Sequence, residues 1–246
     1  MRRNRKTPLV LPPPSFDGRA NNEGRSRSAS DPASVLRRIQ RKKSILDRAG
    51  AFHVRQLPDD YYARVTFASF RLEGIDLSDQ DVWEALAHQR QRPVLRSRLG
   101  QRLRTHAAIL HHIERNLRKE LSLETSGVVR WYTAISSGLS TTSLSQTSLA
   151  TLEELVRRIN ATPPRVQVAL REIVTSHTRL VADPLVPGFN GILARLLLRF
   201  HLGRWGFPAI LFDSFLDGQR LSSDSLARRL MQLVEQRYDD LLARQH

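Results

Sequence analysis

The chain has 246 residues, of which 40% are hydrophobic and 26% charged, the composition of a globular protein that buries one sizeable core. It contains no cysteine, which excludes disulfides, thiolate metal sites and a thiol nucleophile. The absence of cysteine also fits a cytoplasmic location. No apolar run reaches the roughly 18 residues of a membrane span, so we expect none.

The net charge of +15 is concentrated near the N-terminus, since residues 1–55 contain 14 Lys and Arg against 4 Asp and Glu. Residues 1–31 are rich in Pro, Ser, Gly, Asn and Arg and have few large apolar groups, which predicts a disordered basic arm. Such a segment is either a solubilising tail or a contact for nucleic acid or another polyanion, here through residues 1–55.

Residues 32–56 are predicted to contain a basic helix. Asp31 can cap its N-terminus, and Pro32 suits its first turn. A helix of this kind packs on its own core, on RNA or on an acidic membrane, and the first outcome is the commonest. Its apolar stripe consists of Val35, Leu36, Ile39, Ile45 and Leu46.

Apolar residues recur at helical spacing through most of the remaining sequence, and no alternating pattern indicates a sheet. We therefore predict an all-α protein with a helical domain at residues 57–217 and an amphipathic C-terminal helix at 218–246. The Ser-, Thr- and Gly-rich residues 136–148 predict a loop. Ser78 is expected to cap a short helix whose inward residues are Val82, Trp83, Ala85 and Leu86. The other helices are expected near residues 61–72, 95–121, 123–135, 149–159, 166–178 and 191–202.

The helix expected near residues 191–202 is apolar on nearly every side, which places it at the centre of the core. Asn190 is in position to be its N-cap, and Gly188 and Gly191 allow the backbone to approach a bound group closely. The unpaired N–H groups and the dipole of a helix start favour an anion, and Arg195 adds a full charge one turn further on. These four residues are a candidate phosphate site.

The segment from residue 183 to 210 resembles the signature of the Fic (Fido) family, H-P-F-x-[D/E]-G-N-G-R-x-x-R, which is followed by a buried helix and a G-[YF]-P stretch. Two alignments are open. Without a gap, Asn190, Gly191 and Arg195 match, and Pro184 takes the place of the catalytic His. If Phe189 is an insertion, Pro184 and Gly188 also match, and Asp183 replaces the His.

The resemblance implies a Fic/Fido-like helical domain, but the residues of the chemistry are absent. In Fic enzymes the His accepts a proton from a target hydroxyl that attacks the α-phosphate of ATP. Ile192 takes the place of the first Arg, and Gly188 or Pro187 takes the place of the acidic metal ligand. Asp183 is the one remaining candidate base, and an ordinary carboxylate with a pKa of about 3.9 is a poor base for an alcohol. The resemblance therefore implies a degenerate Fic-fold protein, inactive as an AMP transferase, with ATP as a candidate ligand and no metal expected.

Ser69-Phe70-Arg71-Leu72-Glu73-Gly74 resembles a second Fic element, the inhibitory pattern [S/T]-x-x-x-E-[G/N]. In relatives the Glu of this helix contacts the second signature Arg and blocks the productive nucleotide pose. The resemblance thus assigns a regulatory role to Ser69, Glu73 and Gly74 and implies an ion pair between Glu73 and Arg195.

The histidines do not have the spacing of a helical metal site, because His106 is five or six residues from His111 and His112. We expect these three at the surface or its boundary, His201 half-buried and His177 in a structural role.

Three functions remain open at this point. The chain is a Fic-fold module that responds to a nucleotide or phosphate or binds a protein, an enzyme with altered chemistry at Asp183, or an unrelated helical protein that binds nucleic acid through its basic arm.

Overall fold

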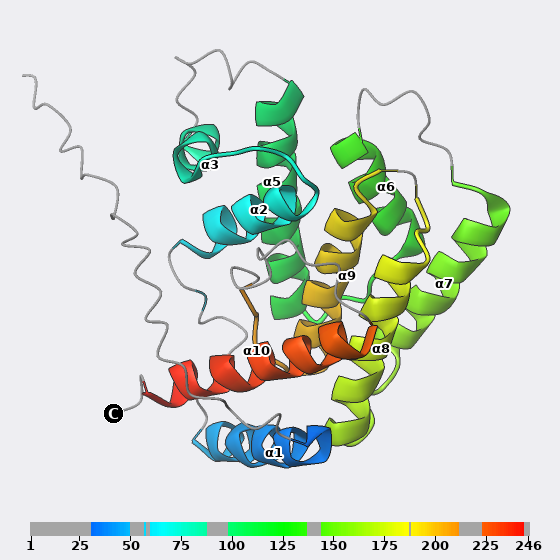
Figure 1. Cartoon of the computed structure of the whole chain (residues 1–246). Helices are drawn as coiled ribbons and strands as arrows, with labels where there is room; N and C mark the ends of the chain where they lie inside the picture. Colours follow the sequence, from blue (N-terminus) through cyan, green and yellow to red (C-terminus); the bar gives the residue numbers. More distant parts are fainter. Residues whose placement is uncertain are drawn as a thin grey trace, which may run out of the picture. The chain divides into compact units, whose positions relative to one another are not determined.

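The structure is a computed structural model that describes residues 31–49, 57, 60–87, 98–136, 144–186, 188–211 and 223–243. The predicted disordered arm and the centre of the predicted loop, residues 137–143, lie outside the described residues, and so do residues 50–56. All described residues belong to one unit that begins at Asp31. Within them the chain forms α1 (Pro32–Arg48), α2 (Tyr61–Leu72), α3 (Asp79–Leu86), α5 (Arg98–Arg118), α6 (Thr125–Ser136), α7 (Gln146–Asn160), α8 (Val166–Ala182), α9 (Asn190–Arg204) and α10 (Ser223–Ala243) (Figure 1).

No strand occurs in the described ranges, so the prediction of an all-α protein is confirmed. Most predicted helices agree with the observed ones to within a few residues at each end. Local chemistry sets several of these ends. Asp31 accepts a hydrogen bond from the backbone N–H of Ala33 at the start of α1, and Ser78 forms a capping box with Asp81 at the start of α3.

α9 lies at the centre of the main core, with α2, α5, α7 and α8 in contact with it (Figure 1). Every residue from Ile192 to Gly203 is buried, as the all-round apolar pattern predicts. Burial of each large apolar side chain in this helix is worth about 1.5–3 kcal/mol relative to its exposure. The position of α9 therefore depends on side-chain burial on all of its sides.

A second apolar cluster joins α1, α8 and α10 to the C-terminal half of α9. Val35, Leu36, Ile39 and Leu46 of α1 are buried in it, so the apolar stripe packs on the protein's own core. Ile45 is a correction to the predicted stripe, because it remains 37% exposed. The stripe is narrow, and Ile45 lies beside it.

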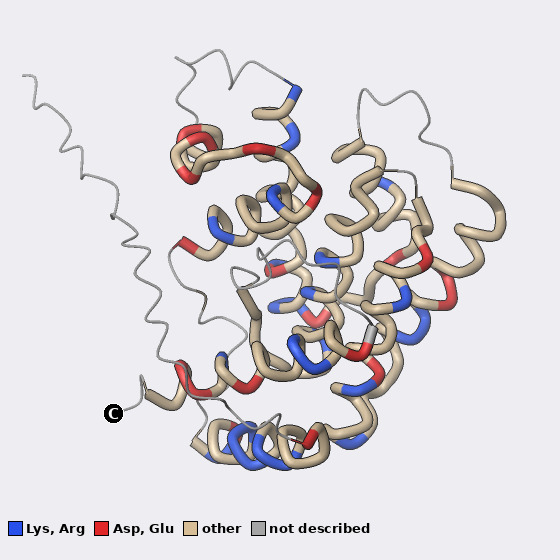
Figure 2. The backbone as a smooth tube through the Cα atoms, in the orientation of Figure 1, with Lys and Arg blue, Asp and Glu red and all other residues tan. Residues whose placement is uncertain are grey.

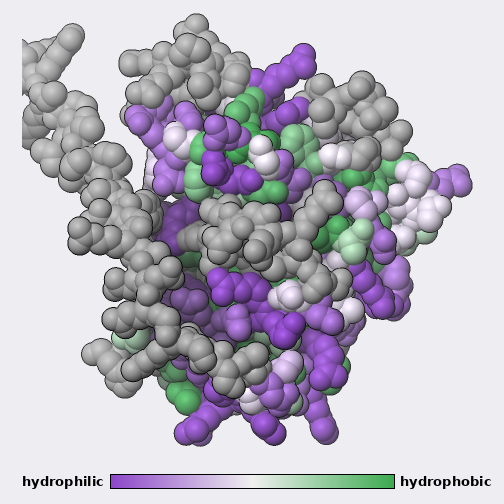
Figure 3. All heavy atoms as spheres, viewed as in Figure 1, coloured by the Kyte–Doolittle hydropathy of each residue, from purple (hydrophilic) through white to green (hydrophobic). Residues whose placement is uncertain are grey.

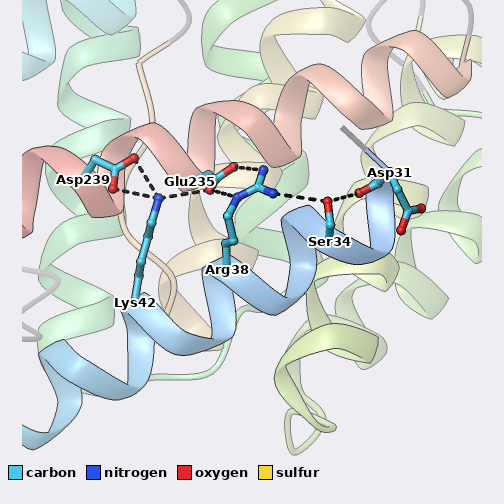
Figure 4. A network of polar contacts seen from close by, with 6 residues as sticks. All are labelled: Asp31, Ser34, Arg38, Lys42, Glu235 and Asp239. Carbon is cyan, nitrogen blue, oxygen red and sulfur yellow. Dashed lines mark hydrogen bonds and ion pairs between the residues drawn. The ribbon is translucent and has the colours of Figure 1, made fainter. Parts of the chain in front are cut away.

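Ion pairs join α1 to α10 along the edge of this cluster (Figure 4). Arg38 Nε lies 2.6 Å from Glu235 Oε1, and Lys42 Nζ lies 3.0 Å from the same oxygen and 2.7 Å from Asp239 Oδ1. The hydrogen bond from Arg38 is the main cause of the lowered pKa of Glu235. Each partly exposed pair contributes about 0–1 kcal/mol, so these contacts set the pairing of two helices more than the total stability.

Three predicted environments are wrong. Trp83 was expected to face inward and is 37% exposed on α3. His106 was expected near the surface and is fully buried, while His201, expected to be half-buried, is 2% exposed. His106 contacts Thr66 and Phe70 of α2, and His201 belongs to α9, which is buried on all sides. None of the described helices is both long and apolar enough to cross a membrane.

Candidate functional site

The C-terminal end of α2 meets the first turns of α9, and a polar contact is buried between them. Arg195 Nη2 lies 2.8 Å from Glu73 Oε1, and the same nitrogen donates to the backbone oxygen of Ser69 at 2.7 Å. Arg195 Nε also donates to Ser69 Oγ at 3.3 Å. The structure therefore contains the ion pair that the sequence resemblance implies, and it adds Ser69 as a second anchor for the guanidinium.

Gly191 is what permits the carboxylate of Glu73 to lie here. A Cβ atom at residue 191 would overlap Glu73 Oε1 and would lie 3.0 Å from Arg195 Nη1. Glu73 thus occupies the space that a glycine leaves at the start of α9. The first N–H groups of a helix and its positive end lie in this place, which suits a negative charge.

The loop before α9 is held by Asn190, but not as predicted. The N-cap is Phe189, whose φ of 52° is left-handed, and Asn190 is the first residue of the helix. Its side-chain Nδ2 donates to the backbone oxygen of Leu180 at 2.6 Å, and its Oδ1 accepts from the N–H of Leu185 at 3.0 Å. Asn190 therefore fastens the loop to the end of α8. Gly188 precedes it with a φ of 65°, a conformation that favours glycine.

Arg195 is 8% exposed, and burial lowers the pKa of its guanidinium, while Glu73 acts in the opposite direction. Two buried histidines lie near it. Burial is the main cause that lowers the pKa of His106 to about 3 and of His177 to about 4, and the charge of Arg195 adds to both shifts. His106 Nδ1 lies 2.9 Å from Thr66 Oγ1, and His177 Nδ1 lies 3.3 Å from the backbone oxygen of Ala194. Arg195 is thus a cation among neutral groups, with Glu73 as its counter-charge.

Asp183 lies elsewhere. It is the C-cap of α8, is exposed, and lines a pocket of about 410 Å³ between α7, α8 and the loop that follows α8. Arg158, Ser176, Arg179 and Pro184 line the same pocket. Gly188, Asn190, Gly191 and Arg195 are not among its lining residues. The predicted site residues therefore fall into two places, with the candidate base in one and the candidate phosphate clamp in the other.

The residue in the place of the first signature Arg does not supply a positive charge. Ile192 is fully buried in the main core, so its side chain contributes packing and no charge. Within the described residues, no group of three or more His, Asp and Glu side chains is arranged to hold a metal ion.

Sequence reasoning missed a second buried ion pair one turn further along α9. Arg199 Nη2 lies 2.6 Å from Glu114 Oε1 of α5, with side-chain exposures of 3% and 2%. Burial raises the pKa of Glu114, and Arg199 opposes that shift. The sequence does indicate such a pair, because an arginine in the middle of a helix that is apolar on all sides needs a buried partner.

Comparison with known proteins supports the fold. No protein-family model matches the sequence, and no curated protein matches it. Fic-1 from C. elegans superposes with a TM-score of 0.62 and 17% sequence identity, over 87% of this chain and 73% of that chain. A Fic-domain-containing signalling protein from Bacteroides thetaiotaomicron superposes with a TM-score of 0.57 and 15% identity, over 84% of this chain and 95% of that chain. The chain has the fold of Fic domains.

A variant of the same C. elegans protein gives a TM-score of 0.61 at 17% identity, over 85% of this chain and 72% of that chain. At such identities the likeness establishes the Fic fold and nothing of the activity. The prediction of a Fic/Fido-like helical fold is therefore confirmed, and the roles of the individual site residues remain predictions.

Proposed function

We propose that this chain is a Fic-fold regulatory or binding module that does not transfer AMP and that responds to a phosphate-bearing ligand, with ATP as the first candidate. The contact between Glu73 and Arg195 carries the proposal. It pairs a buried guanidinium with a partly buried carboxylate at a helix start, where a phosphate would meet the same arginine.

The separation of the two places described above supports the absence of transfer. Proton abstraction requires a base within hydrogen-bond reach of the attacking hydroxyl, beside the groups that stabilise the phosphate. Asp183 lines the pocket between α7 and α8, whereas Arg195 is buried against α2. Ile192 supplies no charge in the core. A base, a clamp and a metal anchor are therefore not combined in one site of the described residues.

The fit for a phosphate is conditional on Glu73. Gly191 leaves room for an anion and Arg195 supplies a cation, but the carboxylate fills that room and pairs with the cation. Asn190 is engaged with Leu180 and Leu185, so it holds the loop in place. A phosphate-bearing ligand would compete with Glu73 for Arg195, and the displacement of α2's end would be the response that a partner protein reads.

Calorimetric titration with ATP and Mg²⁺ tests the proposal in wild type, Glu73→Gly and the double variant Glu73→Gly, Arg195→Ala. We expect weak binding by wild type, at least about tenfold tighter binding by Glu73→Gly, a difference of about 1.4 kcal/mol, and loss of that gain in the double variant. Glu153→Gly on an exposed face of α7 is the control for an acidic-to-glycine change and should bind as wild type does. Equal, weak or absent binding by all four proteins would refute the nucleotide-responsive function.

A further inference from the structure

The outward face of α1 carries a straight row of arginines. Arg37, Arg41 and Arg48 are all exposed. At 100° per residue these positions fall within an arc of about 40°, and the row extends about 16 Å along the helix axis. The buried residues Val35, Ile39 and Leu46 lie on the opposite side of the helix, so the row points away from the core.

The structure separates these arginines from the other cations of α1. Arg38 and Lys42 pair with Glu235 and Asp239 of α10, and Lys43 pairs with Asp47. By contrast, no ion pair joins Arg37, Arg41 or Arg48 to any acid in the described part of the chain. Figure 2 shows the resulting concentration of basic residues on α1, and Figure 3 shows hydrophilic side chains along the lower edge of the molecule where α1 lies.

A fourth cation extends the surface onto α8. The side chain of Gln167 donates to Gln40 of α1 at 2.9 Å, which fixes the two helices side by side. Arg171 is exposed one turn further along α8 from Gln167. No ion pair with Arg171 occurs within the described ranges either. In the sequence, a further seven Lys and Arg against two Asp and Glu precede α1 in residues 1–30.

The chemistry of this face selects its partner. α1 has buried Val35, Leu36, Ile39 and Leu46 against the core, and Ile45 alone of its large apolar side chains is exposed, which is too little apolar surface to hold the helix in a lipid surface. Its sequence contains no aromatic residue on which an unstacked base could lie. Guanidinium groups in a row suit a line of phosphates without base recognition. We propose that the exposed row of Arg37, Arg41 and Arg48 on α1 binds the phosphate backbone of double-stranded nucleic acid, independently of base sequence.

The test uses the full chain and a labelled DNA duplex of about 20 base pairs, with binding measured by fluorescence anisotropy between about 50 and about 200 mM salt. The row variant carries Arg37→Gln, Arg41→Gln and Arg48→Gln. The control triple removes the same charge from exposed positions at the end of α5, directly after it and on α6: Arg118→Gln, Lys119→Gln and Arg130→Gln.

We expect the wild type and the control triple to bind alike, and the row variant to bind at least tenfold more weakly. The slope of log K against log salt is negative, and each lost phosphate contact reduces its magnitude by about 0.9, so the slope of the row variant should be shallower by about 2–3. A variant with Lys at all three row positions should keep most of the affinity. Equal losses in the row variant and the control triple would overturn the proposal. So would binding to anionic phosphatidylserine vesicles that depends on the row when duplex binding does not.

Discussion

Glu73 and Arg195 are 122 residues apart in sequence, yet Oε1 of one and Nη2 of the other are 2.8 Å apart. The pair joins the end of α2 to the helix at the centre of the core. Arg195 has a side-chain exposure of 9% and Glu73 of 20%, so the guanidinium is the more desolvated partner. Loss of Glu73 therefore leaves a buried cation with only Ser69 as partner, whereas loss of Arg195 leaves a carboxylate that water can still reach.

A side chain at Gly191 should break the contact between Glu73 and Arg195. In Gly191→Ala the new methyl group would overlap the carboxylate of Glu73, so we expect a loss of about 1–3 kcal/mol in the free energy of unfolding. Gly127→Ala on α6 is the matched control, because its nearest atoms would be 3.8 and 4.0 Å away. That change should stabilise by about 0.5–1 kcal/mol, since alanine is the better helix former. Chemical denaturation measures both, and equal effects of the two changes would contradict the close packing at Gly191.

Leu197 should be among the most sensitive positions of the core. It is 1% exposed in the middle of α9, so Leu197→Ala should cost about 2–5 kcal/mol through lost burial and a cavity. Leu149→Ala on α7 serves as the control, because Leu149 is 37% exposed and should cost well under half as much. Urea unfolding curves give both values. A loss below about 0.5 kcal/mol in the free energy of unfolding for Leu197→Ala would contradict the central placement of α9.

Stability should fall in mild acid. Burial lowers the pKa of His106 and His201 to about 3 and of His177 to about 4, against about 6.5 in an unfolded chain. Between these values the unfolded chain binds more protons than the folded one, so stability rises with pH and is lost as pH falls below about 6.5. Near pH 5 each histidine adds a slope approaching about 1.4 kcal/mol per pH unit.

Unfolding free energies measured from pH 7.5 down to pH 5 in steps check this expectation. His106→Gln should reduce the slope of the unfolding free energy against pH by the contribution of one histidine. A stability that is flat over this range would show that these three imidazoles are not buried as neutral groups.

The purified protein should not label itself or other proteins with AMP. Asp183 and Pro184 line a pocket apart from Arg195, and Ile192 is buried, so no described site unites a base with a phosphate clamp. Labelled ATP with cell lysate, and an active Fic enzyme as positive control, provide the assay. Labelling by wild type or by Glu73→Gly that disappears in Arg195→Ala would instead show a working active site.

Much of the fold was readable from local pattern. The all-round apolar run around Leu197 predicts a central helix, and the stripe around Ile39 predicts a helix packed on the core. The Glu73–Arg195 contact was predictable only through the resemblance to Fic signatures, because nothing in the local sequence of either residue points to the other.

What the sequence did not reveal depends on pairing between distant segments. The Asn190 side chain can cap a helix or bind two backbone groups, and the choice depends on where α8 ends. The burial of His106 depends on α2, which brings Thr66 to its ring. Arg199 is a charged residue in an apolar helix, and its partner Glu114 lies on α5, so the local sequence does not show that the charge is paired. Composition likewise shows only that α1 is basic. In the structure, acids of α10 pair with Arg38 and Lys42 on one flank, and within the described residues the outer row of Arg37, Arg41 and Arg48 has no ion pair.

The most direct test of the account is a double-mutant cycle on Glu73 and Arg195, with unfolding free energies of wild type, Glu73→Gly, Arg195→Ala and the double variant. Glu73→Gly leaves the buried guanidinium without its counter-charge and should cost about 3–5 kcal/mol, whereas Arg195→Ala should cost less because water still reaches the carboxylate. The double variant should lose well below the sum of the single losses. ATP should raise the melting temperature of Glu73→Gly and leave the Arg195→Ala proteins unchanged. Strictly additive losses, with no effect of ATP on any of the four proteins, would contradict the account.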